Sequence, residues 1–155
     1  MKNRWFIFLF ATMAFSLNIY ATDSEPKPAQ IEWFTNYDEA LEYSKVTNKP
    51  LILLFTGSDW CSWCQKLDRE VLQQSEFAEM CADKFVFVMV DFPHSHDLPP
   101  AQEHQNLGLK NMYGVRGFPK MVIVDEKQQK VVYINYRRGG PKKHAERLLN
   151  ALNDK

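Results

Sequence analysis

The chain has 155 residues, of which 45% are apolar and 25% are charged, so it has the length of one domain and the composition of a folded protein. Three cysteines are too few for a disulfide-dense miniprotein, and the composition also excludes disordered and collagen-like chains. Nineteen basic residues balance nineteen acidic ones, so no net charge attracts nucleic acid.

Residues 1–21 have the layout of a secretory signal peptide. Lys2 and Arg4 precede an apolar stretch, and Ala21 supplies a small residue for signal peptidase. A retained membrane anchor is the alternative, but residues 5–20 are shorter than the ~20 apolar residues that span a bilayer. We therefore expect an exported protein in a compartment where disulfides can form and persist. Residues 152–155 are not a Lys-Asp-Glu-Leu type retention signal, so a bacterial periplasm is expected over the endoplasmic reticulum.

Residues 22–30 are polar and contain two prolines, which indicates a flexible linker before a domain at residues 31–155. The first half of this domain predicts alternating strands and helices. The second and third strands are apolar throughout, as in a sheet covered on both faces. Strands are expected at residues 31–34, 51–55 and 85–90, and helices from Tyr37 to before Asn48, from near Cys61 and from Ser75.

The second half opens with residues 93–105, whose prolines and histidines predict a long polar connection. A short helix follows, with Leu109, Met112 and Tyr113 in phase. Strands at residues 121–124 and 131–134 predict an antiparallel hairpin. The order β-α-β-α-β-α-β-β-α requires a mixed sheet with helices on both faces, which is an α/β fold. The last helix follows Gly139 and Gly140, and its apolar stripe is Ala145, Leu148, Leu149 and Leu152.

The chemistry is carried by Trp60-Cys61-Ser62-Trp63-Cys64, which follows a buried strand and opens a helix. Unsatisfied N–H groups and the helix dipole at such a position favour a thiolate at Cys61. Two intervening residues bring the sulfur of Cys64 within bonding distance, one turn inward and shielded from solvent. We predict that Cys61 attacks a substrate disulfide and that Cys64 resolves the mixed disulfide.

A metal site and a structural disulfide are the other interpretations of this pair. Zinc needs four ligands, and the chain has no second Cys-x-x-Cys pair. A site that adds His94 or His96 remains an alternative, and the protein would then be a metal-binding or copper-delivery module. A disulfide across so short a loop constrains little chain entropy. Redox chemistry is favoured, with no metal and no organic cofactor.

Three segments together carry a resemblance to a known family. They are the strand followed by residues 60–64, the strand that ends at Val90-Asp91, and Tyr113-Gly114-Val115-Arg116-Gly117-Phe118-Pro119. From about residue 31 onward, the sequence resembles the thioredoxin superfamily. The sequence looks most similar to periplasmic thioredoxin-like oxidoreductases of the DsbH type. Three features carry this resemblance: the export signal, the approach loop at residues 56–59 that leads to the cysteines, and the long polar loop.

The resemblance implies a thioredoxin fold, with a central mixed β-sheet flanked by helices on both faces. It also implies a cis peptide bond between Phe118 and Pro119, with Pro119 facing Cys61 and the backbone of Phe118 pairing with an extended substrate. Trp60 and Trp63 flank the cysteines, and we interpret them as an apolar lip for protein substrates. Periplasmic isomerases are dimers with an added dimerisation domain, for which this chain leaves no room, so a monomer is expected.

The sequence departs from thioredoxin at the buried aspartate that assists proton transfer to the inner cysteine. That position is Leu54 here, which leaves Asp59 and Lys66 as candidates for the proton-transfer group. The third cysteine, Cys81, lies in phase with Phe77 and is predicted to be a small buried apolar residue.

The residues between the cysteines indicate the direction of the reaction. Ser62 and Trp63 include no histidine, so the Cys61 thiolate lacks one stabiliser that strong oxidases use. A reductase is therefore predicted, with a periplasmic oxidase as the alternative. A reductase leaves its reaction oxidised and needs electrons, and the resemblance implies that a DsbD-type membrane partner supplies them.

Overall fold

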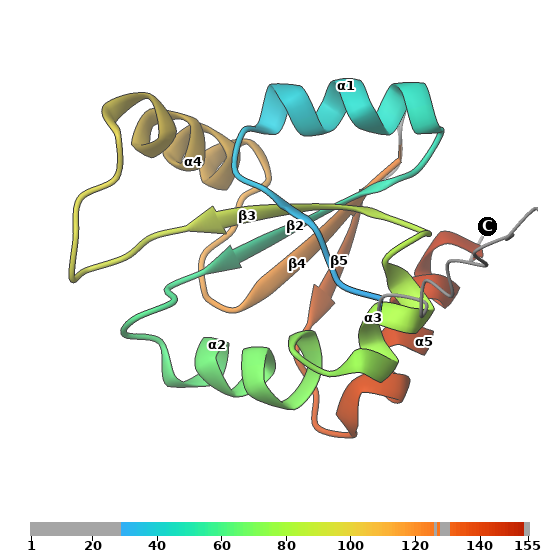
Figure 1. The fold of residues 1–155 in the computed structure, drawn as a ribbon. Helices are drawn as coiled ribbons and strands as arrows, with labels where there is room; N and C mark the ends of the chain where they lie inside the picture. The colour runs from blue at the N-terminus through green and yellow to red at the C-terminus, as the bar shows by residue number, and fades with distance from the viewer. Residues whose placement is uncertain (1–28, 126, 128–130, 154–155) are drawn as a thin grey trace, which may run out of the picture.

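The computed structural model describes residues 29–125, 127 and 131–153 (Figure 1). The predicted signal peptide, most of the predicted linker and most of the turn between the last two strands lie outside these residues. One sheet runs through the domain in the strand order β1-β3-β2-β4-β5. The strands are β1 (Trp33–Phe34), β2 (Leu51–Thr56), β3 (Val86–Asp91), β4 (Lys120–Val124) and β5 (Val131–Asn135).

The sheet is mixed, as the sequence predicts. β3 pairs in parallel with both β1 and β2, whereas β4 runs antiparallel to β2 and β5 antiparallel to β4. Two helices, α1 (Tyr37–Thr47) and α4 (Pro100–Met112), cover one face (Figure 1). The other face is covered by α2 (Ser62–Leu67), the π-helical turn η1 (Asp68–Leu72), α3 (Ser75–Cys81) and α5 (Gly140–Asn153).

Strand β2 lies in the middle of the sheet because all six of its side chains are apolar or small enough to be buried on either face. Ile52 and Leu54 pack with the core under α3 and α5. Leu51, Leu53 and Phe55 pack with the core under α1 and α4. Since Thr56 ends this strand at the loop that leads to α2, the two cores fix where the cysteine helix begins.

The helices confirm most of the expected boundaries. Asn36 caps α1 by accepting hydrogen bonds from the N–H groups of Asp38 and Glu39, and Asn48 ends it in the left-handed conformation at φ 54°. The helix that follows β2 continues beyond α2 as η1, which the sequence analysis did not predict. Within the described residues, no helix has the length and apolar character to cross a membrane.

The expected boundary at residues 93–105 is wrong. Helix α4 already begins at Pro100, so His104 lies on a helix and not in the long connection. Proline at the first helical position is a start signal, because the missing N–H has no partner there in any case. Leu109 and Tyr113 are buried as expected, but Met112 is 69% exposed and takes no part in the packed stripe.

The third cysteine confirms its predicted role. Cys81 is a free thiol and fully buried, in the core that also contains Phe77. Burial raises the pKa of the Cys81 thiol to about 12, and the charge of Asp83 acts in the same direction. The thiol therefore stays protonated at neutral pH and packs as an apolar side chain.

Candidate active site

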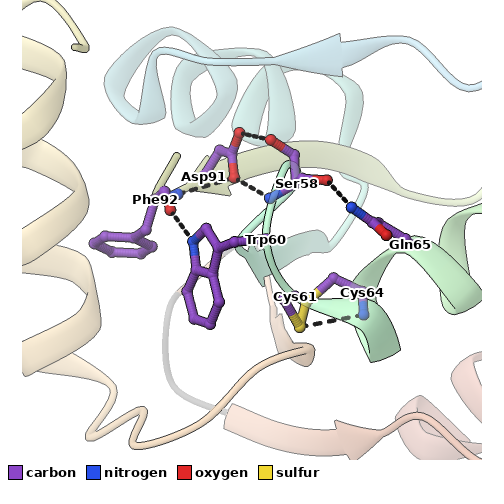
Figure 2. The surroundings of a disulfide bond; sticks show 7 residues. All are labelled: Ser58, Trp60, Cys61, Cys64, Gln65, Asp91 and Phe92. Carbon is purple, nitrogen blue, oxygen red and sulfur yellow. Dashed lines mark hydrogen bonds between the residues drawn. A yellow bond between two sulfur atoms is a disulfide. The ribbon is translucent and has the colours of Figure 1, made fainter. Parts of the chain in front are cut away.

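Cys61 and Cys64 form a disulfide at the first turn of α2, with their Cα atoms 5.2 Å apart (Figure 2). Cys61 is the N-cap residue of this helix and has extended backbone angles. The backbone N–H of Cys64 donates to Sγ of Cys61 over 3.2 Å, so the sulfur takes the place that a serine or aspartate oxygen has in an ordinary cap. A helix N–H group is thus already aimed at Sγ of Cys61.

The two sulfurs differ less in exposure than the sequence predicts. Cys61 is 8% exposed and Cys64 3% exposed, so the inner position of Cys64 is as expected but Cys61 is also buried. The N–H of Cys61 donates to the carbonyl of Gly57 over 2.9 Å, which folds the approach loop over this residue. Its side chain turns back to bond Cys64 and not out into solvent.

The approach loop is anchored to the end of β3 (Figure 2). Asp91 accepts hydrogen bonds from the N–H of Ser58 over 2.9 Å and from its hydroxyl over 2.5 Å. The indole Nε1 of Trp60 donates to the carbonyl of Phe92 over 2.7 Å. Because β3 is paired with strands on both sides, these bonds hold the segment that leads to Cys61 against the interior of the sheet.

Gly57 is a site residue that the sequence analysis missed. A Cβ atom at this position would lie 2.4 Å from Cε2 of Trp60, so no larger residue fits beneath the indole. The glycine lets the ring lie flat over the loop while its carbonyl accepts the N–H of Cys61. The only signal in the sequence is the position of the glycine directly after a buried strand.

The predicted substrate-binding residues gather on one surface beside the disulfide. Trp60 is 44% exposed and Trp63 51% exposed. The ring of Phe118 lies 6.0 Å from that of Trp60, and the peptide bond between Phe118 and Pro119 is cis. A groove of about 290 Å³ is lined by Trp63, Phe118, Pro119, Asn135 and Tyr136.

Residues from distant segments support the two tryptophans, and the sequence analysis missed them. The imidazole of His94 stacks on the indole of Trp60 at 4.5 Å between centroids. Tyr136 lies 6.2 Å from the ring of Trp63 and donates its hydroxyl to Glu70. These contacts join residues more than thirty positions apart, and no local spacing indicates them.

Asp59 and Lys66, the candidates for proton transfer, are engaged elsewhere. Hydrogen bonds from Ser95, first through its side chain and then its backbone, and from the N–H of His94 lower the pKa of Asp59 to about 2. Asp59 therefore stays ionised and ties the loop after β3 to the approach loop. Lys66 pairs with Glu70 at 3.2 Å, and its ammonium lies 5.9 Å from the ring of Trp63. Both candidates thus have partners other than Cys64.

The metal-binding alternative was based on His94 or His96 as further ligands. In the part of the chain that the structure describes, no three side chains of His, Cys, Asp or Glu are grouped to hold a metal ion. The imidazole of His94 stacks on Trp60, and His96 contacts the hydroxyl of Ser95 at 3.3 Å.

The comparisons with known proteins agree with this geometry. Residues 37–154 match the thioredoxin-like domain family. The chain belongs to this family. A solved structure described as DsbH oxidoreductase is 36% identical to this chain, with a TM-score of 0.78. The matched region covers 87% of this chain and 94% of the chain in that structure.

Two curated relatives of this thioredoxin-like protein come from Chlamydia pneumoniae. The disulfide bond reductase DsbH is 39% identical over 80% of this chain and 74% of its own length. The thioredoxin-related protein DsbJ is 30% identical over 81% of this chain but only 37% of its own length. With the Cys61–Cys64 disulfide at the start of α2, these findings make the chain a thioredoxin-like thiol–disulfide oxidoreductase.

Proposed function

We propose that this oxidoreductase is an exported reductase of protein disulfides. The observation that carries the proposal is the hydrogen bond from the N–H of Cys64 to Sγ of Cys61 at the start of α2. In the reduced protein the same N–H would stabilise a Cys61 thiolate, together with the other free N–H groups of the first turn. A thiol with the reference pKa of ~8.5 is only about 3% ionised at pH 7, whereas one near ~7 is about half ionised.

The reaction has two exchange steps. The Cys61 thiolate attacks one sulfur of a substrate disulfide, which forms a Cys61–substrate disulfide and releases the other substrate sulfur as a thiolate. The Cys64 thiolate then attacks Sγ of Cys61, and the second substrate sulfur leaves. Two electrons pass to the substrate, and the protein is left with the Cys61–Cys64 disulfide that this structure contains.

Substrate binding is proposed at the surface between the two tryptophans. Trp60 and Trp63 present large apolar areas beside buried sulfurs, so a segment that packs on them is brought to the disulfide. The groove lined by Trp63, Phe118 and Pro119 is the place proposed for an extended chain of the substrate. We assign Phe118 the role of pairing its backbone with that chain, as a strand added beside the site. The chemistry recognised is then an exposed apolar segment next to a disulfide, as in an unfolded or misoxidised protein.

Two features support reduction over oxidation. The residues between the cysteines include no histidine, so the Cys61 thiolate lacks the positive side chain that strong oxidases place inside this motif. The relative that is 39% identical is named a disulfide bond reductase. As a reductase the protein must be reduced again after each turnover, and we propose that a DsbD-type membrane protein supplies the electrons. Residues 1–21 are proposed as the signal that exports the chain to the periplasm.

The direction can be tested by offering both reactions under one set of conditions. The reduced protein is mixed with insulin, and the oxidised protein with a reduced, unfolded substrate such as ribonuclease. We expect insulin reduction to run to completion and ribonuclease oxidation to stop early. The reason is that the Cys61–Cys64 disulfide is expected to be more stable than the disulfides of the substrates. Fast and complete oxidation of ribonuclease, with insulin left intact, would show an oxidase instead.

A further inference from the structure

A cavity beneath the active-site helix reaches the inner cysteine. Its volume is about 280 Å³, and both Cys64 and Asp68 line it, one helical turn apart on the same face. Leu54 of β2 forms part of its wall, and Thr56 and Gln65 add polar groups. Thr56, Ser58, Gln65, Asp68 and Arg69 offer water polar partners in an otherwise apolar lining. Where such partners are present, room for about one probe sphere is enough to hold a water molecule.

Asp68 is the acidic residue that this cavity offers to Cys64. The other carboxylates around the site are engaged: Asp59 with residues 94–95, Asp91 with Ser58, and Glu70 with Lys66 and Tyr136. Within the described residues, Asp68 has one side-chain partner, Gln73, whose amide donates to Oδ2 over 2.5 Å. The second oxygen, Oδ1, is therefore available to water in the cavity.

The other charged residue at the cavity cannot take this role. Arg69 also lines it, but a guanidinium stays protonated in proteins and accepts no proton. The hydroxyls of Thr56 and Ser58 can relay a proton between waters but are not bases at neutral pH. A base that serves Cys64 from this side must therefore be a carboxylate.

We infer that Asp68 accepts the proton of the Cys64 thiol through water in this cavity during the resolving step. The inference rests on the exchange reaction proposed above. The proton passes from Sγ of Cys64 to a water and from that water to Oδ1 of Asp68. The sulfur electron pair then forms the bond to Cys61, the Cys61–substrate bond breaks, and the substrate leaves as a thiolate. When the protein is reduced again, Asp68 returns the proton to Cys64.

The two exchange steps can be timed separately with an aromatic disulfide, dithiobis-nitrobenzoate. In a stopped-flow experiment the reduced protein releases one coloured thiolate when Cys61 attacks and a second when Cys64 resolves the adduct. For Asp68→Asn we expect the second phase to slow about 100-fold at pH 7, the lower range for loss of a general base. The first phase should keep its rate. The wild-type and Asp68→Asn proteins should have the same second-phase rate near pH 10, because there a thiol loses its proton to solvent without a base.

Two further variants separate proton transfer from a structural role. Asn keeps the size of Asp68 and can still accept the hydrogen bond from Gln73, and Asp68→Glu should restore most of the second phase. Glu76→Gln removes an exposed carboxylate from α3, outside the residues that line the cavity, and should leave both phases unchanged. An Asp68→Asn protein whose second phase is unchanged at pH 7, or is slowed equally at every pH, would overturn the inference. A wild-type protein without a first phase would refute the proposed function itself.

Discussion

Replacing Cys61 with serine is expected to abolish reduction of insulin, whereas Cys64→Ser is expected to leave the protein bound to its substrate. Sγ of Cys61 accepts the helix N–H, so we expect this sulfur to ionise and attack. Without Cys64 nothing resolves the first product. A mixed disulfide between Cys61 and the substrate should then accumulate to about one per chain, and a non-reducing gel would show it as a shifted band.

Cys81→Ser is the matched control for these two variants. This thiol is fully buried in the core under α3, and its removal should leave the rate of insulin reduction unchanged. Alkylation of the reduced wild-type protein should label Cys61 before Cys64, and both well before Cys81. A mixed disulfide that forms through Cys64 in the Cys61→Ser protein would reverse the assigned roles.

A buried histidine makes the stability of the fold depend on pH. His144 of α5 is fully buried, and its Nδ1 lies 3.0 Å from a guanidinium nitrogen of Arg147. Because arginine can only donate, Nδ1 accepts, and Nε2 then carries the hydrogen that faces Sδ of Met121 at 3.4 Å. Burial first, and then the charge of Arg147, lowers the pKa of His144 to about 4.

The sign of the pH effect follows from the two states of this histidine. In the unfolded chain His144 takes up a proton near its ordinary pKa of 6.5, whereas in the folded protein it does so only near 4. The stabilisation is therefore fully present above pH 6.5 and is lost as the pH falls toward 4. Each pH unit within this window costs about 1.4 kcal/mol, so we expect a loss of about 2 kcal/mol between pH 7 and pH 5.

Urea unfolding of the oxidised protein at pH 7 and pH 5 measures this loss. His144→Gln should remove most of the difference between the two pH values, whatever it does to the stability at each. His96→Gln, at an exposed position, should keep it. Carboxylates whose pKa is lowered in the fold, such as Asp59 and Glu70, affect stability only below about pH 5 and do not confuse the comparison. An equal loss in the wild-type and His144→Gln proteins would contradict the assignment.

The parts of the fold that the sequence predicts are those with a strong local pattern. The apolar run that forms β2 can only be a central strand, and the hairpin of β4 and β5 has two apolar segments around a charged turn. Helix α4 was mistaken for a loop in its first half because its proline, glutamines and histidine carry no apolar period. One of its two buried residues is Asn106, whose amide donates to the carbonyl of Asp91. A polar residue buried for a hydrogen bond is invisible to a search for apolar periodicity.

In the site too, the residues predicted from the sequence are those that belong to a local motif, whereas the residues that support them were missed. Cys61, Cys64 and the cis bond before Pro119 belong to continuous segments that the sequence displays. The support around them is assembled from distant parts of the chain. Asp59 was a candidate for proton transfer because it precedes Cys61 by two positions, but its carboxylate binds a loop 35 positions later. Its partners are the N–H groups of His94 and Ser95 and the side chain of Ser95, and no local spacing in the sequence links them to Asp59.

The reduction potential of the mature protein tests the proposed direction most directly. The purified protein is equilibrated with glutathione buffers of known ratio, and the dithiol fraction is read from alkylation or from tryptophan fluorescence. We expect a potential close to the ~−270 mV of thioredoxin, because a backbone N–H is aimed at Sγ of Cys61 and the residues between the cysteines include no histidine. A potential near the ~−120 mV of the strong oxidase DsbA lies about 7 kcal/mol away and would contradict the assignment as a reductase.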